Sequence, residues 1–424
     1  MTDRSVIVVV LDRWGAGQVA ALGATMLEMP AVNRLAASAL TANFCFTDSP
    51  DLELVYRSYW SGHHAADGRE MNVSEHWAMH TEASTLLVTD EPLVRDHPLA
   101  RHFEEKILLP PSTADRSAVE VSETHLARLL FAAGEAILNL PSPNITWIHA
   151  QAMGAPWDAP LELRQSLADE QDPQTTESVI PPSQLMDDQK DYDAILGMSQ
   201  AYGGQVLALD ELLGGLIEVL DQRPPEIVEN TLLIVTSPRG FPLAEHGVIG
   251  SADTRLFSEL LHVPLFVRIG RGRFGEAGAL QRTSALIQPP DIAATIAHWL
   301  GVPDSTTWGK SLIPLATHPD PSSLAPRGWR SALSTFTSRD GAKQTYFATP
   351  SWSLSCSQAS GEADPQLALF SKPDDRWEVN EISSRAPQAR EKMLEQFEVT
   401  RDAIVNGTRD ALLELPELLL RPSR

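Results

Sequence analysis

Two apolar runs in this sequence each end on charged side chains. VIVVVL at 6–11 is followed by Asp12 and Arg13, and TLLIVT at 231–236 is followed by Ser237, Pro238 and Arg239. A carboxylate can bind a cation or cap a helix, whereas a guanidinium is a permanent cation that only donates hydrogen bonds. The arginines therefore predict either pairing with acids or a site for a small anion, and pairing is the more common fate of an interior arginine.

The surrounding elements indicate an α/β protein. Strands are predicted at 6–11, 42–46, 84–90, 144–150, 231–236 and 263–269, and helices at 30–40, 56–62, 122–140, 192–220 and within 285–303. We expect 91–115 to leave the sheet and 170–189 to form a surface loop. Alternating strands and helices predict a doubly wound, mostly parallel sheet flanked by helices, whose ligands bind outside the carboxyl ends of the strands.

The character of the sequence changes after residue 320. TYFATPSWSLSC and LALFSK are typical of antiparallel strands, and Arg385 to Leu420 is rich in Ala, Glu and Leu, as in a long helix. We therefore expect an α/β domain at 1–320 and a small α+β C-terminal subdomain at 321–424.

Segments spread over nearly the whole chain follow one family pattern. They include VIVVVLDR at 6–13, APWDAP at 155–160, TLLIVTSPRGFPLAEHG at 231–247, DIAATIAHWLGVPDSTTWGKSLIP at 291–314 and LALFSKPDDRWEVNEISS at 367–384. In this order they resemble the sulfatase family of the alkaline phosphatase superfamily. The resemblance implies a sulfuric ester hydrolase fold, a divalent cation that is usually calcium, and a Cys or Ser nucleophile that becomes formylglycine.

The positions that carry the family's chemistry differ in this chain. Two adjacent family aspartates match Asp12-Arg13, and a later Asp-His or Asp-Asn pair matches Pro238-Arg239. The family nucleophile lies four residues before an arginine, and the matching residues here are Glu53 and Arg57. A family histidine matches Gly154. Glu245-His246-Gly247 is retained. The side chain of proline offers no ligand to a metal, and a guanidinium offers none to a cation. The resemblance therefore implies that the metal-binding positions and the nucleophile position have been lost.

The resemblance thus predicts a sulfatase-like protein without catalytic activity, catalytic residues, metal or cofactor; calcium is expected only if this interpretation is wrong. Arg13 and Arg239 would supply the charge of the missing cation. They could pair with Asp12 and hold the fold or, with Arg57, bind a tetrahedral anion. We expect a residual pocket in which the following residues converge: Asp12, Arg13, Arg57, Arg239, Glu245 and His246. The alternative is a sulfuric or phosphoric ester hydrolase that uses atypical residues.

Other candidate residues have simpler interpretations. Four histidines suggest a metal site: His63, His64, His76 and His80. No carboxylate completes the ligand set, so structural or surface roles are favoured. His246 could keep a polar role in the pocket or make a contact within a hairpin. Trp157 is expected to pack in the interior, with a ligand contact as the alternative.

Composition restricts the partners. The 424 residues include 33 basic and 56 acidic side chains, for a formal net charge of -23, which disfavours nucleic acid and anionic membranes. Cys45 and Cys356 suggest no disulfide framework, and neither a signal peptide nor a membrane span is evident. We expect a cytoplasmic protein whose partner is a small anionic ligand, such as a sulfate or phosphate ester, or another protein.

Overall fold

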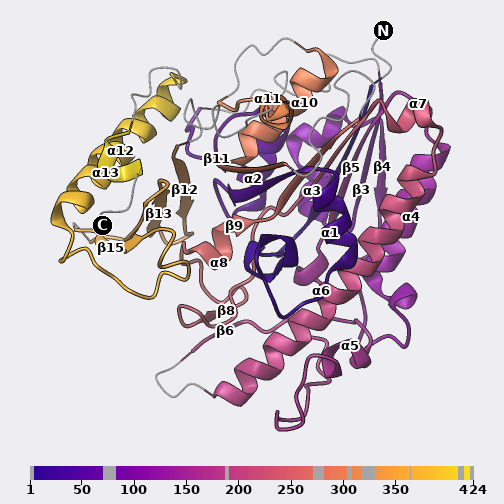
Figure 1. Ribbon diagram of the computed structural model, residues 1–424, viewed down its shortest axis with the longest axis horizontal. Coiled ribbons are helices and arrows are strands. Elements are labelled where there is room, and N and C mark those ends of the chain that lie inside the picture. Colours follow the sequence, from indigo (N-terminus) through magenta and orange to yellow (C-terminus); the bar gives the residue numbers. More distant parts are fainter. Residues whose placement is uncertain are drawn as a thin grey trace.

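The computed structural model describes residues 4–69, 83–186, 191–270, 281–302, 308–317, 330–362, 364–408 and 415–420. Figure 1 shows a large α/β body that contains the N-terminal strand, with the C-terminal segment packed against one edge of it. No helix among the described residues is long and apolar enough to cross a membrane.

The centre of the α/β body is a nine-stranded sheet among the described residues. Eight strands follow the order β11-β2-β10-β7-β1-β5-β3-β4, and the short β9 pairs with β2. Their bounds are β1 (Ser5–Leu11), β2 (Leu40–Phe46), β3 (Ser84–Thr89), β4 (Glu105–Leu108), β5 (Asn144–Ala150), β7 (Thr231–Thr236), β9 (His262–Val263), β10 (Leu265–Ile269) and β11 (Gln281–Ile287). β10 runs antiparallel to β7 and β2, and β9 is antiparallel to β2, whereas the other pairs are parallel.

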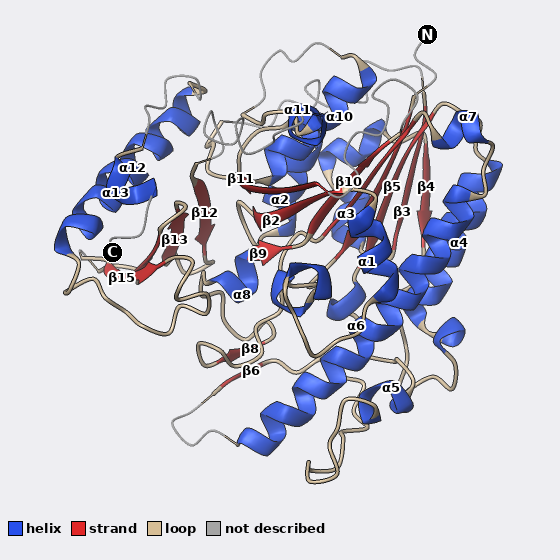
Figure 2. Ribbon diagram, viewed as in Figure 1, coloured by secondary structure: helices blue, strands red, loops and turns tan. Residues whose placement is uncertain are grey.

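Both faces of this sheet are buried by helices, which explains the continuous apolar runs of the strands. In β1, Ile7, Val9 and Leu11 pack into one core while Val6, Val8 and Val10 pack into the other. The first core is completed by α1 (Pro30–Ala37), α4 (His125–Asn139) and α6 (Tyr192–Asp221), and the second by α2 (Leu52–Ser61), α10 (Pro289–Leu300) and α11 (Ile313–Thr317). Figure 2 shows the two helical layers on either side of the sheet.

Short elements connect these layers. They are α3 (Pro92–Asp96), α5 (Leu161–Gln165), α7 (Pro225–Val228), α8 (Ser258–Leu261) and a two-stranded sheet of β6 (Gln184–Leu185) and β8 (Val248–Ile249).

The C-terminal segment forms a second sheet of four antiparallel strands. These are β12 (Ala332–Thr337), β13 (Lys343–Ala348), β14 (Trp352–Gln358) and β15 (Gln366–Ser371), followed by α12 (Pro387–Asn406) and α13 (Glu417–Leu420). The predicted fold class, a mostly parallel α/β sheet with an antiparallel C-terminal sheet, is confirmed.

Three predicted elements need correction. The excursion expected at 91–115 returns to the sheet as β4, whose short, half-exposed edge strand lacks the apolar run of a buried strand. The helix predicted at 56–62 begins earlier, at Leu52, because Asp51 caps its first turn. The helix predicted from Arg385 to Leu420 ends at Asn406, where Gly407 adopts a φ of 64°.

Candidate functional site

The turns after β1 and β7 meet because these two parallel strands are neighbours. Val10 of β1 is in register with Thr236 of β7, so both chains leave the sheet at the same edge. Asp12 is held in its turn by a backbone hydrogen bond from its N–H to the carbonyl of Ala150 at the end of β5. Three adjacent strands thus fix the position of Asp12.

Asp12 and Arg239 form a bidentate ion pair at this edge. The Nε atom of Arg239 donates to Oδ1 of Asp12 at 3.0 Å, and Nη2 donates to Oδ2 at 2.9 Å. The remaining terminal nitrogen, Nη1, donates to the carbonyl of Pro50 at 2.9 Å. The Asp12 side chain is 3% exposed and the Arg239 side chain 18%. The parallel geometry is the strongest arrangement available to an arginine and a carboxylate.

The charges at this edge stabilise the ionised acid. Burial alone would raise the pKa of Asp12, but the positive charges of Arg239 and Arg13 outweigh it and lower that pKa. Burial and the like charge of Arg239 lower the pKa of Arg13 to about 10, while Asp12 opposes them. Both arginines therefore remain charged at neutral pH, and two cations face one carboxylate.

Arg13 occupies the space that Gly154 leaves open. The backbone of Arg13 has a φ of 64°, an uncommon conformation for a non-glycine residue, and its carbonyl accepts a hydrogen bond from the Tyr202 hydroxyl at 2.7 Å. A Cβ added at Gly154 would lie 3.2 Å from both Cδ and Nε of Arg13. The absence of a side chain at Gly154 thus admits the arginine.

The guanidinium of Arg13 has an unused hydrogen-bonding capacity. It lies over the ring of Phe241, with its central carbon 6.0 Å from the ring centroid. In the part of the chain that the structure describes, this guanidinium forms no hydrogen bond or ion pair. An arginine has five N–H donors, so this group can bind an anion without first breaking another contact.

Arg13 and Arg239 line a cavity of about 680 Å³. One wall comes from the start of α2, including Asp51 and Glu53, and another from the segment after β3, including Glu91 and His97. Phe336 and Arg339 extend the cavity to the C-terminal sheet. Acids outnumber arginines on these walls, so a bound anion has to approach along the arginine side.

Glu53 lies at the first turn of α2, where the resemblance places a nucleophile. It is exposed, and its backbone N–H donates to the capping carboxylate of Asp51 at 2.8 Å. Its backbone carbonyl lies 3.1 Å from Nε2 of His97. The Glu53 side chain thus borders the cavity together with both arginines.

The expected convergence of all six predicted residues does not occur, and Arg57 is the clearest correction. From the middle of α2, its Nη2 donates to the carbonyls of Asp67 at 2.5 Å and His64 at 3.4 Å. It is 9% exposed and does not line the cavity of Arg13 and Arg239. The helix begins at Leu52, and its periodicity directs this side chain toward the loop after Gly62.

Glu245 and His246 also lie outside the cavity lining. Oε2 of Glu245 accepts a hydrogen bond from the N–H of Leu243 at 2.6 Å. Nδ1 of His246 lies 2.7 Å from Oε1 of Glu259, and Nε2 lies 3.0 Å from the carbonyl of Glu378. Burial lowers the pKa of His246, but the Glu259 carboxylate more than compensates and the net shift is upward. This histidine therefore links the turn before β8 to α8 and to the segment after β15.

The remaining candidates are structural where they are described. Trp157 is buried against Tyr202 and Phe241, and its Nε1 donates to the Met153 carbonyl at 2.9 Å. His63 and His64 are both buried, His63 beside Asp67 and His64 beside Gln288. His76 and His80 lie outside the described residues.

Sequence reasoning missed several residues of the cavity. Asp51 has a recognisable signal as a helix cap before an apolar run, and Glu91 follows the strand at 84–90. Phe336 and Arg339 have no such signal, because only the packing of the C-terminal sheet brings them to the cavity.

The ligand requirements of calcium can be compared with this edge of the sheet. Ca²⁺ takes roughly six to eight oxygen ligands, many of them carboxylate. Both oxygens of Asp12 accept from Arg239, and the side chain of Pro238 carries no donor atom for a metal. The two guanidinium groups add positive charge where a dication would need negative charge. These side chains do not fit a calcium ion.

Comparison with known proteins identifies the family pattern independently. Residues 96–302 match the family model described as Sulfatase. A stretch of 133 residues is 32% identical to an N-acetylglucosamine-6-O-sulfatase of Bacteroides thetaiotaomicron. This match spans 31% of the present chain and 22% of the length of that relative.

Solved structures share the fold over almost the entire chain. The phosphonate monoester hydrolase of Agrobacterium radiobacter superimposes with a TM-score of 0.75 over 95% of this chain and 96% of its own, at 16% identity. A protein solved in complex with its substrate D-glucosamine-2-N,6-O-disulfate gives a TM-score of 0.73 over 96% of this chain and 99% of its own, at 14% identity.

Proposed function

Because this chain belongs to the sulfatase family, we propose that it is a non-hydrolytic member that binds an anionic ligand, a sulfate or phosphate ester, beside Asp12. The observation that carries the proposal is the bidentate pair of Arg239 with Asp12. A guanidinium bonded to both carboxylate oxygens takes the role of a counter-ion, but it cannot act as a Lewis acid or activate a nucleophile.

Arg13 provides the anion-binding group in this proposal. Arg239 is engaged by Asp12 and Pro50, whereas the guanidinium of Arg13 lines the cavity without a hydrogen bond or ion pair among the described residues. A sulfate or phosphate group presents several oxygens to a planar fork of N–H donors, which favours two parallel hydrogen bonds. The positive field of Arg239 adds to the attraction.

The acidic walls restrict the rest of the ligand. Glu53 and Glu91 both line the cavity, and burial raises the pKa of Glu91, with the nearby charge of Asp12 acting in the same direction. A ligand with one ester anion and a neutral, hydroxyl-rich body would meet these acids through hydrogen bonds rather than charge repulsion. One of the proteins that share this fold was solved with a sulfated sugar, D-glucosamine-2-N,6-O-disulfate. A sugar that carries a single sulfate ester would have the chemistry described here.

The test compares binding with turnover. Calorimetric titration with inorganic sulfate and with 4-nitrophenyl sulfate should give saturable binding, and Arg13→Gln should weaken it at least tenfold, the loss of about 1.4 kcal/mol. The control is Arg128→Gln, on the exposed face of α4, which should leave binding unchanged. The absence of saturable binding to the unmodified protein would contradict the proposal.

The alternative, an active ester hydrolase, predicts a different result. It requires release of 4-nitrophenol from the sulfate or phosphate ester, stoichiometric calcium, zinc or manganese in the purified protein, and loss of turnover in Asp12→Ala. If the protein released 4-nitrophenol and Asp12→Ala abolished this turnover, the protein would be an ester hydrolase and our proposal would be wrong.

A further inference from the structure

A second cavity, of about 460 Å³, lies between the α/β body and the C-terminal subdomain. The cavity is lined by β2 and β11 on one side and by β13 and the segment after β15 on the other. None of its lining residues belongs to the cavity of Arg13 and Arg239. It is therefore a separate candidate site, independent of the function proposed above.

Aromatic rings form a continuous apolar wall in this cavity. The ring of Phe46 stacks on His262 with centroids 5.2 Å apart, and it also lies 5.8 Å from the ring of Tyr346. Phe44 lies 5.9 Å from His262, and Leu286 completes the surface. Rings from both parts of the molecule therefore form one surface that can hold an apolar group.

His262 contributes to this wall as a neutral ring. Burial lowers its pKa to about 4, and the positive charges of Arg376 and Lys372 add to that effect. One nitrogen, Nε2, is already used by the carbonyl of Asn43 at 2.9 Å. The wall is thus uncharged at neutral pH, although the field of two nearby cations reaches it.

The two cations differ in how fully their donors are used. Nζ of Lys372 lies 3.0 Å from Oε1 of the buried Glu378 and also donates to the carbonyls of Asp375 and Arg376. Arg376 lies over the ring of Trp377 at 5.0 Å, and among the described residues no acceptor takes a hydrogen bond from its guanidinium. Arg376 is therefore the cation available to a ligand.

The described groups near Arg376 do not accept hydrogen bonds from its guanidinium. Asp375 uses its two carboxylate oxygens to accept from the N–H groups of Val379 at 3.0 Å and Asn380 at 2.8 Å. An added Cβ at Gly23 would lie 3.5 Å from Nη1 of Arg376, so the guanidinium reaches across to the loop of the α/β body. The arginine thus spans the junction at the rim of the cavity.

We propose that this cavity binds a small amphipathic anion, with its aromatic or aliphatic body against Phe44 and Phe46 and its carboxylate, sulfate or sulfonate group at Arg376. Both halves of the ligand are needed for binding. Contact with the apolar wall removes hydrocarbon of the ligand from water, which favours binding. The anionic group adds an ion pair with the guanidinium of Arg376. Since the walls come from two parts of the chain, the ligand would also join them.

Naphthalene-2-sulfonate is a suitable probe, because its rings and its anionic group are rigidly joined. Calorimetric titration of the full chain should show saturable binding that Arg376→Gln weakens at least tenfold. The neutral naphthalene-2-sulfonamide should bind at least tenfold more weakly than the sulfonate, and inorganic sulfate should not compete for this site. Equal affinity of the sulfonate and the sulfonamide would overturn the proposed role of Arg376.

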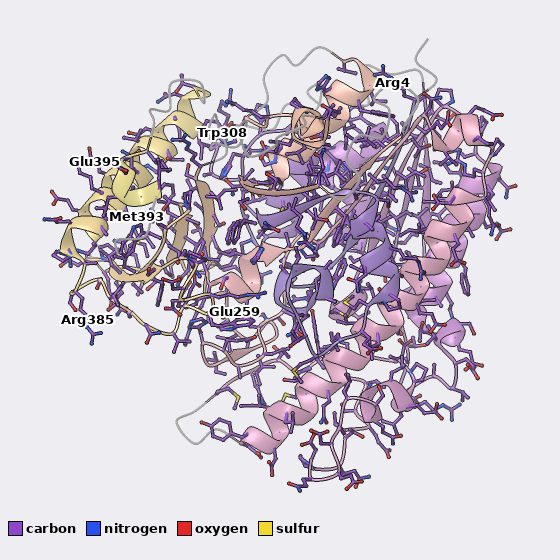
Figure 3. All side chains as sticks on the ribbon, viewed as in Figure 1. Arg4, Glu259, Trp308, Arg385, Met393 and Glu395 are labelled. Atoms are coloured by element: carbon purple, nitrogen blue, oxygen red, sulfur yellow. The ribbon has the colours of Figure 1, made fainter. Side chains whose placement is uncertain are left out.

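Two further variants locate the probe. Ser284 is an exposed residue of the cavity lining, so Ser284→Trp should fill the space from the rim and abolish binding without disturbing the core. The matched control is Arg385→Gln, an exposed arginine at the outer side of the C-terminal subdomain in Figure 3, which should bind normally. If Arg13→Gln rather than Ser284→Trp removed binding, the probe would occupy the other cavity and this proposal would be wrong.

Discussion

Arg239 covers both carboxylate oxygens of Asp12, a residue 227 positions earlier in the chain, with nitrogen–oxygen distances of 2.9 and 3.0 Å. The pair lies at the carboxyl edge of adjacent strands β1 and β7. Because Arg239 also donates to Pro50, the same guanidinium ties the start of α2 to the sheet. One side chain thus holds together the ends of β1 and β7 and the start of α2.

The first prediction concerns the stability of this pair. Arg239→Ala would leave a buried carboxylate without its partner, which lowers the free energy of unfolding by about 3–5 kcal/mol. Removing both charges, in Asp12→Asn with Arg239→Gln, should recover much of that loss. Urea denaturation of the three proteins measures both values.

The Arg268–Asp221 pair is a matched control for that experiment. Arg268 also forms two hydrogen bonds to one carboxylate, but the Asp221 side chain is 45% exposed. Arg268→Ala should therefore cost at most about 1 kcal/mol. If Arg239→Ala and Arg268→Ala lowered the free energy of unfolding by similar amounts, burial would not strengthen the Asp12 pair.

A second prediction tests the fit between Gly154 and Arg13. Gly154→Ala places a Cβ 3.2 Å from two atoms of Arg13, and overpacking of this kind costs about 1 kcal/mol or more. The cost should disappear in an Arg13→Ala background, where the space is free. Thermal unfolding of the double-mutant cycle gives the coupling energy.

Gly215→Ala provides the comparison for Gly154. Gly215 lies within α6, and an added Cβ there has nothing within 4 Å. This substitution should stabilise the protein by roughly 0.5–1 kcal/mol through helix propensity. Additive effects of Gly154→Ala and Arg13→Ala would contradict the steric interpretation.

The third prediction concerns metal binding. Arg13→Asp, Pro238→Asp and Arg239→His together replace two cations and a proline by oxygen and nitrogen ligands next to Asp12. An aspartate tolerates the positive φ of residue 13 better than most side chains do, so the backbone favours the change. Equilibrium dialysis should detect calcium binding in the triple variant and weaker or no binding in the unmodified protein. Failure of the triple variant to gain calcium affinity would mean that more than these side chains has changed.

The fourth prediction is a pH dependence caused by His246. Its folded-state pKa is raised by Glu259, so the pair adds stability that is complete below about pH 6.5 and is lost as the pH rises through the folded value. His246→Gln should therefore destabilise the protein by about 2 kcal/mol at pH 6 and by less at pH 9. Urea midpoints at several pH values measure the difference.

Glu259→Gln should reproduce the same change from the other side of the pair. Figure 3 labels Glu259 at the junction between the α/β body and the C-terminal subdomain, where it contacts His246. In that variant the stability should depend less on pH between about 6 and 9. An unchanged pH dependence in both variants would exclude the pair as its source.

The sequence by itself determined the α/β class and the neighbouring turns that contain Asp12 and Arg239. Strands buried on both faces require continuous apolar runs, and such runs are visible without knowledge of their partners. The run at 231–236 and the residues that follow it therefore gave both the strand and the candidate site. The edge strand β4 escaped detection because its short, half-exposed sequence carries no comparable pattern.

Only the tertiary structure decided which charges meet. Arg57 is retained in the family pattern, yet its guanidinium bonds the backbone after Gly62 because of its direction on α2. The available donors of Arg13 depend on Gly154, and the second cavity depends on contacts between β2 and a segment more than 300 residues later in the chain. Side-chain direction and long-range packing set these relationships, and neither is encoded in the local pattern of residues.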